Sequence, residues 1–127
     1  MSTTKNKKFN TIMPQTTDRV LCIEIDKLIT AEGYAQNFLP KLKSMIEKHG
    51  ELRLLINYKE FKGWEKNAAQ MDLETSAKHA KNLKKLALIN APEKEIFQKT
   101  LKKDIMGGDV KFFKNTEFDK ALEWVSN

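Results

Sequence analysis

Short apolar runs alternate with longer amphipathic stretches along the 127-residue chain. The runs predict five β-strands, at residues 9–13, 19–25, 51–58, 85–90 and 110–113. Those at 19–25 and 51–58 carry apolar residues on both faces, which is typical of central strands that are covered on both sides. Pro14 and the QTTD segment that follows it indicate a turn, so the first two strands are expected to form a hairpin.

The longest amphipathic stretch lies between the second and third strands. Thr30 is expected to cap a helix there, and Gly50 to end it in the left-handed conformation. Its apolar positions recur at helical spacing: Tyr34, Phe38, Leu42, Met45 and Ile46. Pro40 is expected to kink this helix or to start its second half.

Three further helices are predicted. The helix between the third and fourth strands is expected to bury Ala69, Leu73, Ala77 and Ala80 and to expose Lys66, Gln70, Glu74, Lys78 and Lys81. The next begins near Pro92, and its apolar stripe is Ile96, Phe97, Leu101 and Ile105. The last follows a sequence that resembles a capping box, Thr116 to Asp119, and is expected to bury Phe118, Ala121, Leu122 and Val125.

This order of elements predicts the fold class. Strands that alternate with helices form mostly parallel sheets with right-handed crossovers. We therefore expect an α/β domain with a mixed, mostly parallel five-stranded sheet, an antiparallel first strand and about four flanking helices. Residues 9–127 are expected to form one domain, and residues 1–8 a flexible N-terminal tail.

Composition and charge limit the classes of function. The chain is 40% hydrophobic and 31% charged, and its net charge is +6. Its lysines are spread out and its only arginines are Arg19 and Arg53, so nucleic-acid binding is not expected. No apolar run approaches the roughly 20 residues of a membrane span, so the protein is expected to be cytoplasmic. Cys22, the single cysteine, lies within VLCIEI and is expected to be an unreactive core residue.

Residues with catalytic or metal-binding chemistry do not form a recognisable motif. Asp72, Ser76 and His79 fall on one side of a predicted helix, but a catalytic triad requires a nucleophile on an exposed turn beside an oxyanion hole. His49 and His79 lie in separate elements without further ligands at metal-binding spacing. No phosphate-binding glycine loop is present. We therefore predict no catalytic residues, no metal and no cofactor.

Several segments together resemble the SpoIIAA-like branch of the STAS superfamily: HGELRLLINYKEFKGW, AAQMDL, KHAKNLKKLALI, VKFF and ALEWV. The most specific is the FKGW turn at 61–64, followed eight residues later by Asp72. The resemblance implies a small bacterial domain with a fold similar to that of CRAL-TRIO lipid carriers, and a binding module rather than an enzyme. Classical anti-sigma factor antagonists of the superfamily carry a phosphorylatable serine in an Asp-Ser-Ser-Gly-like turn. This chain lacks that turn, which places a phosphorylation switch in doubt.

A candidate binding site follows from the expected sheet. Ligands of open α/β sheets bind beyond the carboxyl ends of the strands, where the sequence places Asp26, Asn57 and Asn90. The FKGW loop leaves from the same edge, so Gly63 is expected to permit a positive φ or a close backbone approach and Trp64 to cover a cleft. The alternative is that Phe61 and Trp64 fill the core beneath the loop. The predicted site comprises Tyr34, Phe38, Phe61, Gly63, Trp64, Asp26, Asn57 and Asn90, with exposed aromatic rings making the contact.

The predicted function is a non-enzymatic, cytosolic, regulatory binding module. Its partner is expected to be another protein or a small hydrophobic, lipid-like ligand, and a homodimer is expected because an edge strand and an apolar helix face favour one. Two alternatives remain open: an enzyme that uses Asp72 and His79, and an electrostatic binder of nucleic acid or anionic membrane.

Overall fold

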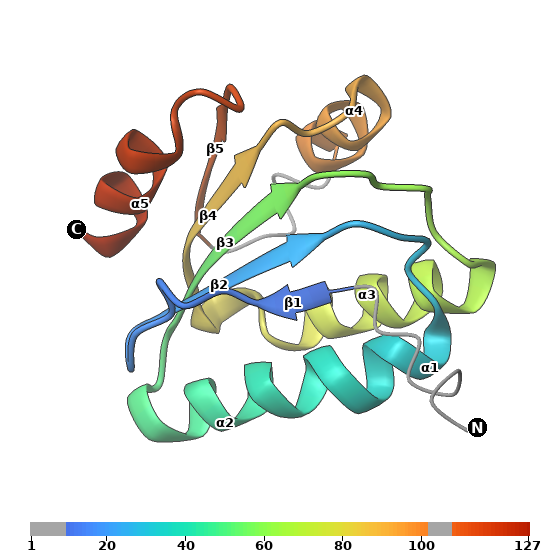
Figure 1. The fold of residues 1–127 in the computed structure, drawn as a ribbon. Coiled ribbons are helices and arrows are strands. Elements are labelled where there is room, and N and C mark those ends of the chain that lie inside the picture. Colours follow the sequence, from blue (N-terminus) through green and yellow to red (C-terminus); the bar gives the residue numbers. More distant parts are fainter. Residues whose placement is uncertain (1–9, 102–107) are drawn as a thin grey trace.

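The computed structural model describes residues 10–101 and 108–127. The predicted tail, 1–8, and the predicted apolar position Ile105 lie outside these residues. The described chain forms an α/β domain, as the strand and helix pattern predicted (Figure 1). No helix within 10–101 and 108–127 is long and apolar enough to cross a membrane.

The sheet contains five strands, which lie side by side in the order in which they occur along the chain. They are β1 (Asn10–Ile12), β2 (Val20–Ile25), β3 (Leu52–Tyr58), β4 (Leu83–Ile89) and β5 (Asp109–Phe113). The short edge strand β1 pairs antiparallel with β2, and each later strand pairs parallel with the one before it.

Helices follow each of the parallel strands. They are α1 (Ala31–Gly33), the π-helical segment η2 (Tyr34–Phe38), α2 (Leu39–His49), α3 (Lys66–Lys78), the short 3₁₀ turn η3 (Ala80–Asn82), α4 (Glu93–Leu101) and α5 (Phe118–Ser126). Segments α1, η2 and α2 run on continuously, and Pro40 stands in the first turn of α2. The predicted first helix therefore exists, and Pro40 starts its second half.

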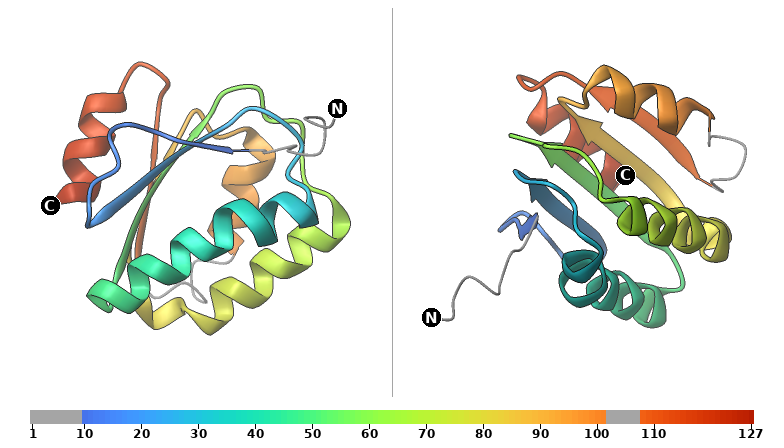
Figure 2. Two further views of the ribbon diagram at one scale, coloured as in Figure 1. Left: turned by 60° about the horizontal axis from the view of Figure 1, so that its bottom comes forward. Right: turned by 90° about the vertical axis from the view of Figure 1, so that its right-hand side faces the viewer.

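Strand order determines which face each helix covers. Successive right-handed crossovers between neighbouring strands leave their helices on one face of a sheet. Helices α2 and α3 accordingly lie next to each other along one face, whereas α5 covers the opposite face (Figure 2). Two buried clusters result. The larger contains Leu21, Ile23, Leu54 and Leu88 under α2 and η2, and the smaller contains Cys22, Leu55, Ala87 and Val125 under α5.

The helix ends show which local predictions were correct. Thr30 Oγ1 accepts a hydrogen bond from the backbone N–H of Gly33 at 3.0 Å, and Gly50 ends α2 with φ of 72°. Both caps are confirmed. The capping box at Thr116 is wrong, because Glu117 is the N-cap of α5 and makes no side-chain cap. The Glu117 carboxylate instead accepts from the backbone N–H of Lys114 at 2.8 Å.

Candidate functional site

Helix α3 turns a polar side toward the sheet, contrary to the prediction. Ala69 and Ala77 are exposed and Leu73 is 39% exposed, so these three positions of the predicted apolar stripe face outward, whereas the fourth, Ala80, lies in η3 and lines the cavity. Ala68 is the only α3 residue that is fully buried. The inward side instead carries Asp72, Thr75, Ser76 and His79, all of which line a cavity. A helix that exposes leucine and turns an acid and a histidine inward departs from normal amphipathic packing, and such departures concentrate at functional sites.

Helix α4 shows the same inversion. Ile96, placed in the predicted apolar stripe, is 37% exposed, whereas Glu95 and Lys99 are only 4% and 6% exposed. The side chains of Phe97 and Leu101 lie outside the described part of the structure. Charged side chains are almost never buried this deeply unless they are paired, so the surroundings of Glu95 and Lys99 require explanation.

The cavity lies between the sheet and these helices and has a volume of about 80 Å³. Its sheet side is apolar and includes Ile23, Ile25, Leu54, Ile56 and Leu86. Its opposite wall is polar and includes Asp72, Thr75, Ser76, His79 and Lys99. An apolar cavity into which a few polar groups converge is the usual form of a small-molecule site.

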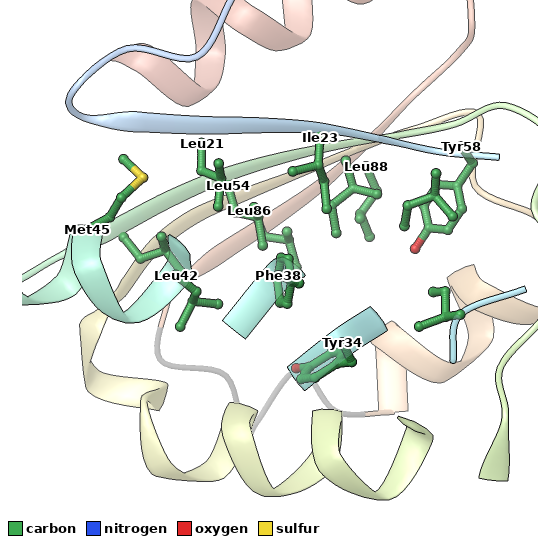
Figure 3. Close-up of a cluster of buried hydrophobic side chains, with 14 of the residues drawn as sticks. Leu21, Ile23, Tyr34, Phe38, Leu42, Met45, Leu54, Tyr58, Leu86 and Leu88 are labelled. Atoms are coloured by element: carbon green, nitrogen blue, oxygen red, sulfur yellow. The ribbon is translucent and has the colours of Figure 1, made fainter. Parts of the chain in front are cut away.

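Two aromatic rings from η2 complete the cavity wall. Tyr34 and Phe38 project from the π-helical segment into the space between the sheet and α3 (Figure 3), with ring centroids 5.1 Å apart. The Tyr34 ring also lies 6.4 Å from that of Trp64. A π-helical turn is rare and is frequently found at functional sites. The expectation that Tyr34 and Phe38 are exposed is wrong, because they are 2% and 5% exposed.

The FKGW loop is held in place by backbone hydrogen bonds to the loop after β2. Ile29 N–H donates to the Gly63 carbonyl and Glu65 N–H donates to the Ile29 carbonyl, both at 2.8 Å. Gly63 has φ of 113°, a value that side chains with a Cβ rarely adopt, although an added Cβ would meet only Leu28 at 4.0 Å. Gly63 is therefore required by its backbone conformation. The result is that the half-buried Trp64 lines the cavity.

The buried Glu95 carboxylate anchors two of the aromatic residues. Tyr58 Oη donates to its Oε1, and Trp64 Nε1 donates to its Oε2, each at 2.9 Å. Both carboxylate oxygens are thus engaged, which offsets the cost of burying this charge. Glu95 fixes the ring positions of Tyr58 and Trp64, both of which line the cavity.

A second carboxylate, Asp72, lies beside the buried ammonium group. Tyr34 Oη donates to Asp72 Oδ1 at 2.7 Å, and Lys99 Nζ lies 3.6 Å from Asp72 Oδ2. The Lys99 ammonium also lies 5.6 Å from the centre of the Trp64 ring, within range of a cation–π contact. Among the described residues, the partly buried Asp72 carboxylate and the buried Lys99 ammonium thus line the cavity, with the buried Glu95 carboxylate behind Tyr58 and Trp64.

Both tyrosines of this network are strongly biased toward their neutral form. Burial raises the pKa of Tyr34 above its usual range, and the charge and hydrogen bond of Asp72 raise it further. Burial likewise raises the pKa of Tyr58, with Glu95 adding to the effect. Both hydroxyls consequently remain hydrogen-bond donors at any physiological pH.

The remaining predicted site residues share an edge of the sheet but do not line this cavity. Asp26 follows β2, Asn57 lies near the end of β3, and Asn90 follows β4. Asn57 alternates with the inward-facing Ile56 and Tyr58, so it points to the opposite face. Asn90, with φ of 59°, donates from Nδ2 to the Tyr58 carbonyl at 2.9 Å and thus connects neighbouring strands.

Phe61 packs on the core beside the loop. It makes an edge-on contact with Tyr58, with ring centroids 5.3 Å apart, and is half-buried. Phe61 therefore fits the core-filling alternative, whereas Trp64 borders the cavity.

Sequence reasoning missed Tyr58, Glu95 and Lys99. Tyr58 ends an apolar strand and looked like one more core residue. Glu95 and Lys99 are an acid and a base four positions apart, the same pattern as the solvent-exposed Glu74 and Lys78. Nothing in the neighbouring sequence distinguishes the buried pair from the exposed pair. Across residues 10–101 and 108–127, no group of three or more His, Cys, Asp or Glu side chains is arranged to hold a metal ion.

The sheet order, the covering helices and the cavity define a small α/β domain of the STAS class. The chain belongs to the SpoIIAA-like family, whose model matches residues 20–126. It is also similar to the crystal structure of an uncharacterised protein of the DUF3478 family with a SpoIIAA-like fold from Shewanella loihica PV-4, with 28% sequence identity, 91% of each chain covered and a TM-score of 0.69. No curated protein matches the chain. The family predicted from the FKGW turn and its flanking segments is confirmed.

Proposed function

We propose that this protein is a non-enzymatic, cytosolic binding module that takes up a small, largely apolar molecule between the sheet and helix α3. One observation carries the proposal: α3 and α4 turn Asp72, Ser76 and Lys99 toward an apolar cavity while Leu73 and Ile96 remain exposed. Burial of polar groups costs free energy that ordinary packing of these helices would avoid. A bound molecule with an apolar body and a polar end would contact both walls at once.

The size of the cavity implies that α3 moves when a ligand enters. A cavity of about 150 Å³ holds a benzene molecule, and the present cavity is about 80 Å³. Because Ala68 is the only fully buried residue of α3, an outward shift of this helix would expose little apolar surface of the helix itself, and the ligand would cover the apolar sheet wall. The proposal therefore includes a small opening between α3 and the sheet on binding.

A pair of leucine substitutions on α3 tests this location. Ser76→Leu places a bulky side chain in the cavity, whereas Ala77→Leu places the same side chain on the exposed side of the same helix. The probe is N-phenylnaphthylamine, whose fluorescence rises in apolar surroundings. We expect at least tenfold weaker binding for Ser76→Leu and unchanged binding for Ala77→Leu. Equal affinities of the two variants would refute the proposed location.

The two tryptophans provide a second readout. Trp64 lines the cavity, and Trp124 packs under the opposite face of the sheet. In a Trp124→Phe protein the probe should quench Trp64 by energy transfer, and in a Trp64→Phe protein it should quench Trp124 much less. Native mass spectrometry of the purified protein would, in addition, detect a co-purified apolar molecule or a dimer.

An enzyme is the second candidate, because Asp72, Ser76 and His79 line the same cavity. An acid, a hydroxyl and an imidazole are the groups that hydrolysis of an ester uses, so a small ester is the substrate to test. His79→Gln should then abolish release of nitrophenol from nitrophenyl acetate, while His49→Gln, at an exposed helix end, should not. Identical rates for both variants would eliminate this candidate.

A further inference from the structure

Lys99 and Asp72 form an ion pair in the wall of the cavity. Lys99 Nζ and Asp72 Oδ2 are 3.6 Å apart, too far for a direct hydrogen bond, and both residues line the cavity. Within the described part of the chain, the Lys99 ammonium makes this ion pair and the contact with the Trp64 ring. Asp72 accepts a hydrogen bond at Oδ1, from Tyr34.

One oxygen atom beside the ion pair can bridge it. An oxygen located about 2.8 Å from each of two atoms that are themselves 3.6 Å apart makes two hydrogen bonds of ordinary length. To satisfy both neighbours it must accept from the ammonium and donate to the carboxylate. A hydroxyl group does both, whereas a carbonyl oxygen can only accept and an amine would bring a second cation beside Lys99.

The charges around this ion pair also favour an uncharged group. Among the described residues, Asp72 and Glu95 contribute two carboxylates to this region, against the ammonium of Lys99. The Glu95 oxygens are already occupied by Tyr58 and Trp64. A ligand carboxylate or phosphate would add a third negative charge where solvent screening is weak, so it would be repelled.

We infer that the ligand is an uncharged apolar alcohol, whose hydroxyl bridges Lys99 Nζ and Asp72 Oδ2 while its hydrocarbon part lies against the sheet. This inference rests on the proposed function and specifies the chemical class of the molecule that the cavity accepts. It also assigns roles: Lys99 and Asp72 bind the hydroxyl, and Glu95 is a positioning residue that holds Trp64 beside Lys99.

The experiment compares four small molecules of similar size: cyclohexanol, cyclohexanone, methylcyclohexane and cyclopentanecarboxylate. Each is titrated into nitrogen-labelled protein while the indole N–H resonances are followed by NMR. Trp64 reports on the cavity, and Trp124, on the other side of the sheet, is an internal control. We expect cyclohexanol to bind at least tenfold more tightly than methylcyclohexane, because two hydrogen bonds to charged groups are gained. Cyclohexanone should fall between them, and the carboxylate should bind most weakly.

A double variant removes the two hydroxyl-binding groups without leaving either charge alone. Lys99→Met combined with Asp72→Leu avoids the destabilisation that follows when one partner of a buried pair is removed. In this protein cyclohexanol should lose its tenfold advantage, while methylcyclohexane should bind as before. The matched control changes an exposed acid and base on the outer side of α3, Glu74→Gln with Lys78→Met, and should keep the preference.

The outcomes separate the two proposals. Equal binding of cyclohexanol and methylcyclohexane, or tightest binding of the carboxylate, would overturn the alcohol inference and leave an apolar binding cavity. An alcohol preference that survives in the double variant would also overturn it. If none of the four molecules shifts the Trp64 resonance, the proposed function fails as well.

Discussion

Replacement of Glu95 by alanine should be one of the most destabilising single changes in the molecule. The Glu95 carboxylate is 4% exposed and accepts hydrogen bonds from Tyr58 Oη and Trp64 Nε1. Each hydrogen bond to a charged group contributes about 1.5–3 kcal/mol net, so two contribute about 3–6 kcal/mol. Part of this loss is offset, because alanine no longer requires a charge to be buried. We expect Glu95→Ala to lower the free energy of unfolding by about 3 kcal/mol.

Two matched substitutions test whether loss of the hydrogen bonds to the Glu95 carboxylate causes this destabilisation. Glu95→Gln keeps the shape and can still accept from Trp64 while donating to Tyr58, so it should cost about 1 kcal/mol. Glu93→Ala removes an exposed acid from the first turn of the same helix. It should cost at most about 0.3–1 kcal/mol through the helix dipole.

Urea unfolding followed by circular dichroism measures all three variants, provided that the dependence of the unfolding free energy on urea concentration stays constant. A double-mutant cycle of Glu95→Ala with Tyr58→Phe should give a coupling energy of at least about 1 kcal/mol. The reasoning is refuted if Glu95→Ala is no more destabilising than Glu93→Ala, or if the cycle shows no coupling.

Three further predictions concern titration, reactivity and backbone packing. The pKa values of Tyr34 and Tyr58 are raised above 10.0 in the folded state, so their contribution to stability is complete below about pH 10. Above that pH the free energy of unfolding should fall by about 1.4 kcal/mol per pH unit for each tyrosine. Urea unfolding of a double phenylalanine variant should show no such fall. Burial raises the pKa of Cys22 from 9.0 to about 11, so a disulfide reagent at neutral pH should label the native thiol at least about a hundredfold more slowly than the unfolded one; equal rates would place Cys22 at the surface. A Cβ on Gly108 would lie 2.4 Å from a backbone oxygen of β4, whereas one on Gly50, at φ of 72°, would meet nothing within 4 Å. In thermal unfolding, Gly108→Ala should therefore cost about 3 kcal/mol of stability and Gly50→Ala about 1 kcal/mol. Equal losses would contradict the close approach at Gly108.

The helix faces illustrate where the sequence misleads. In α3, small or apolar residues occur on both sides: Ala69 and Ala77 on one, Ala68 and Met71 on the other. Helical periodicity therefore does not choose between them, and the prediction took the side with Leu73. A helix over a partly open cavity is not required to bury its most apolar side, because the binding wall has its own polar composition.

The sequence predicted part of the candidate site, namely the residues that are unusual or apolar in their local context. Trp64 and Gly63 were identified because a glycine followed by a tryptophan at the end of an apolar strand is locally unusual. Tyr34 and Phe38 were identified as apolar positions of a helix, although their burial was not foreseen. Glu95 and Lys99 were missed because an acid and a base four residues apart are ordinary on any exposed helix. Their burial depends on Tyr58 and other residues distant in the chain.

The amino-acid sequence by itself determined the succession of strands and helices, the α/β class, the family and the loop that carries Trp64. These features depend on short-range patterns: apolar runs, capping residues and a glycine in a backbone conformation that few other residues adopt. Only the tertiary structure decided which side of α3 and α4 faces inward, and hence that Asp72, Glu95 and Lys99 meet beside an apolar cavity. The reason is physical: burial of a charge is settled by partners from other elements, and here the donors to Glu95 come from β3 and the loop after it, while the partner of Lys99 comes from α3.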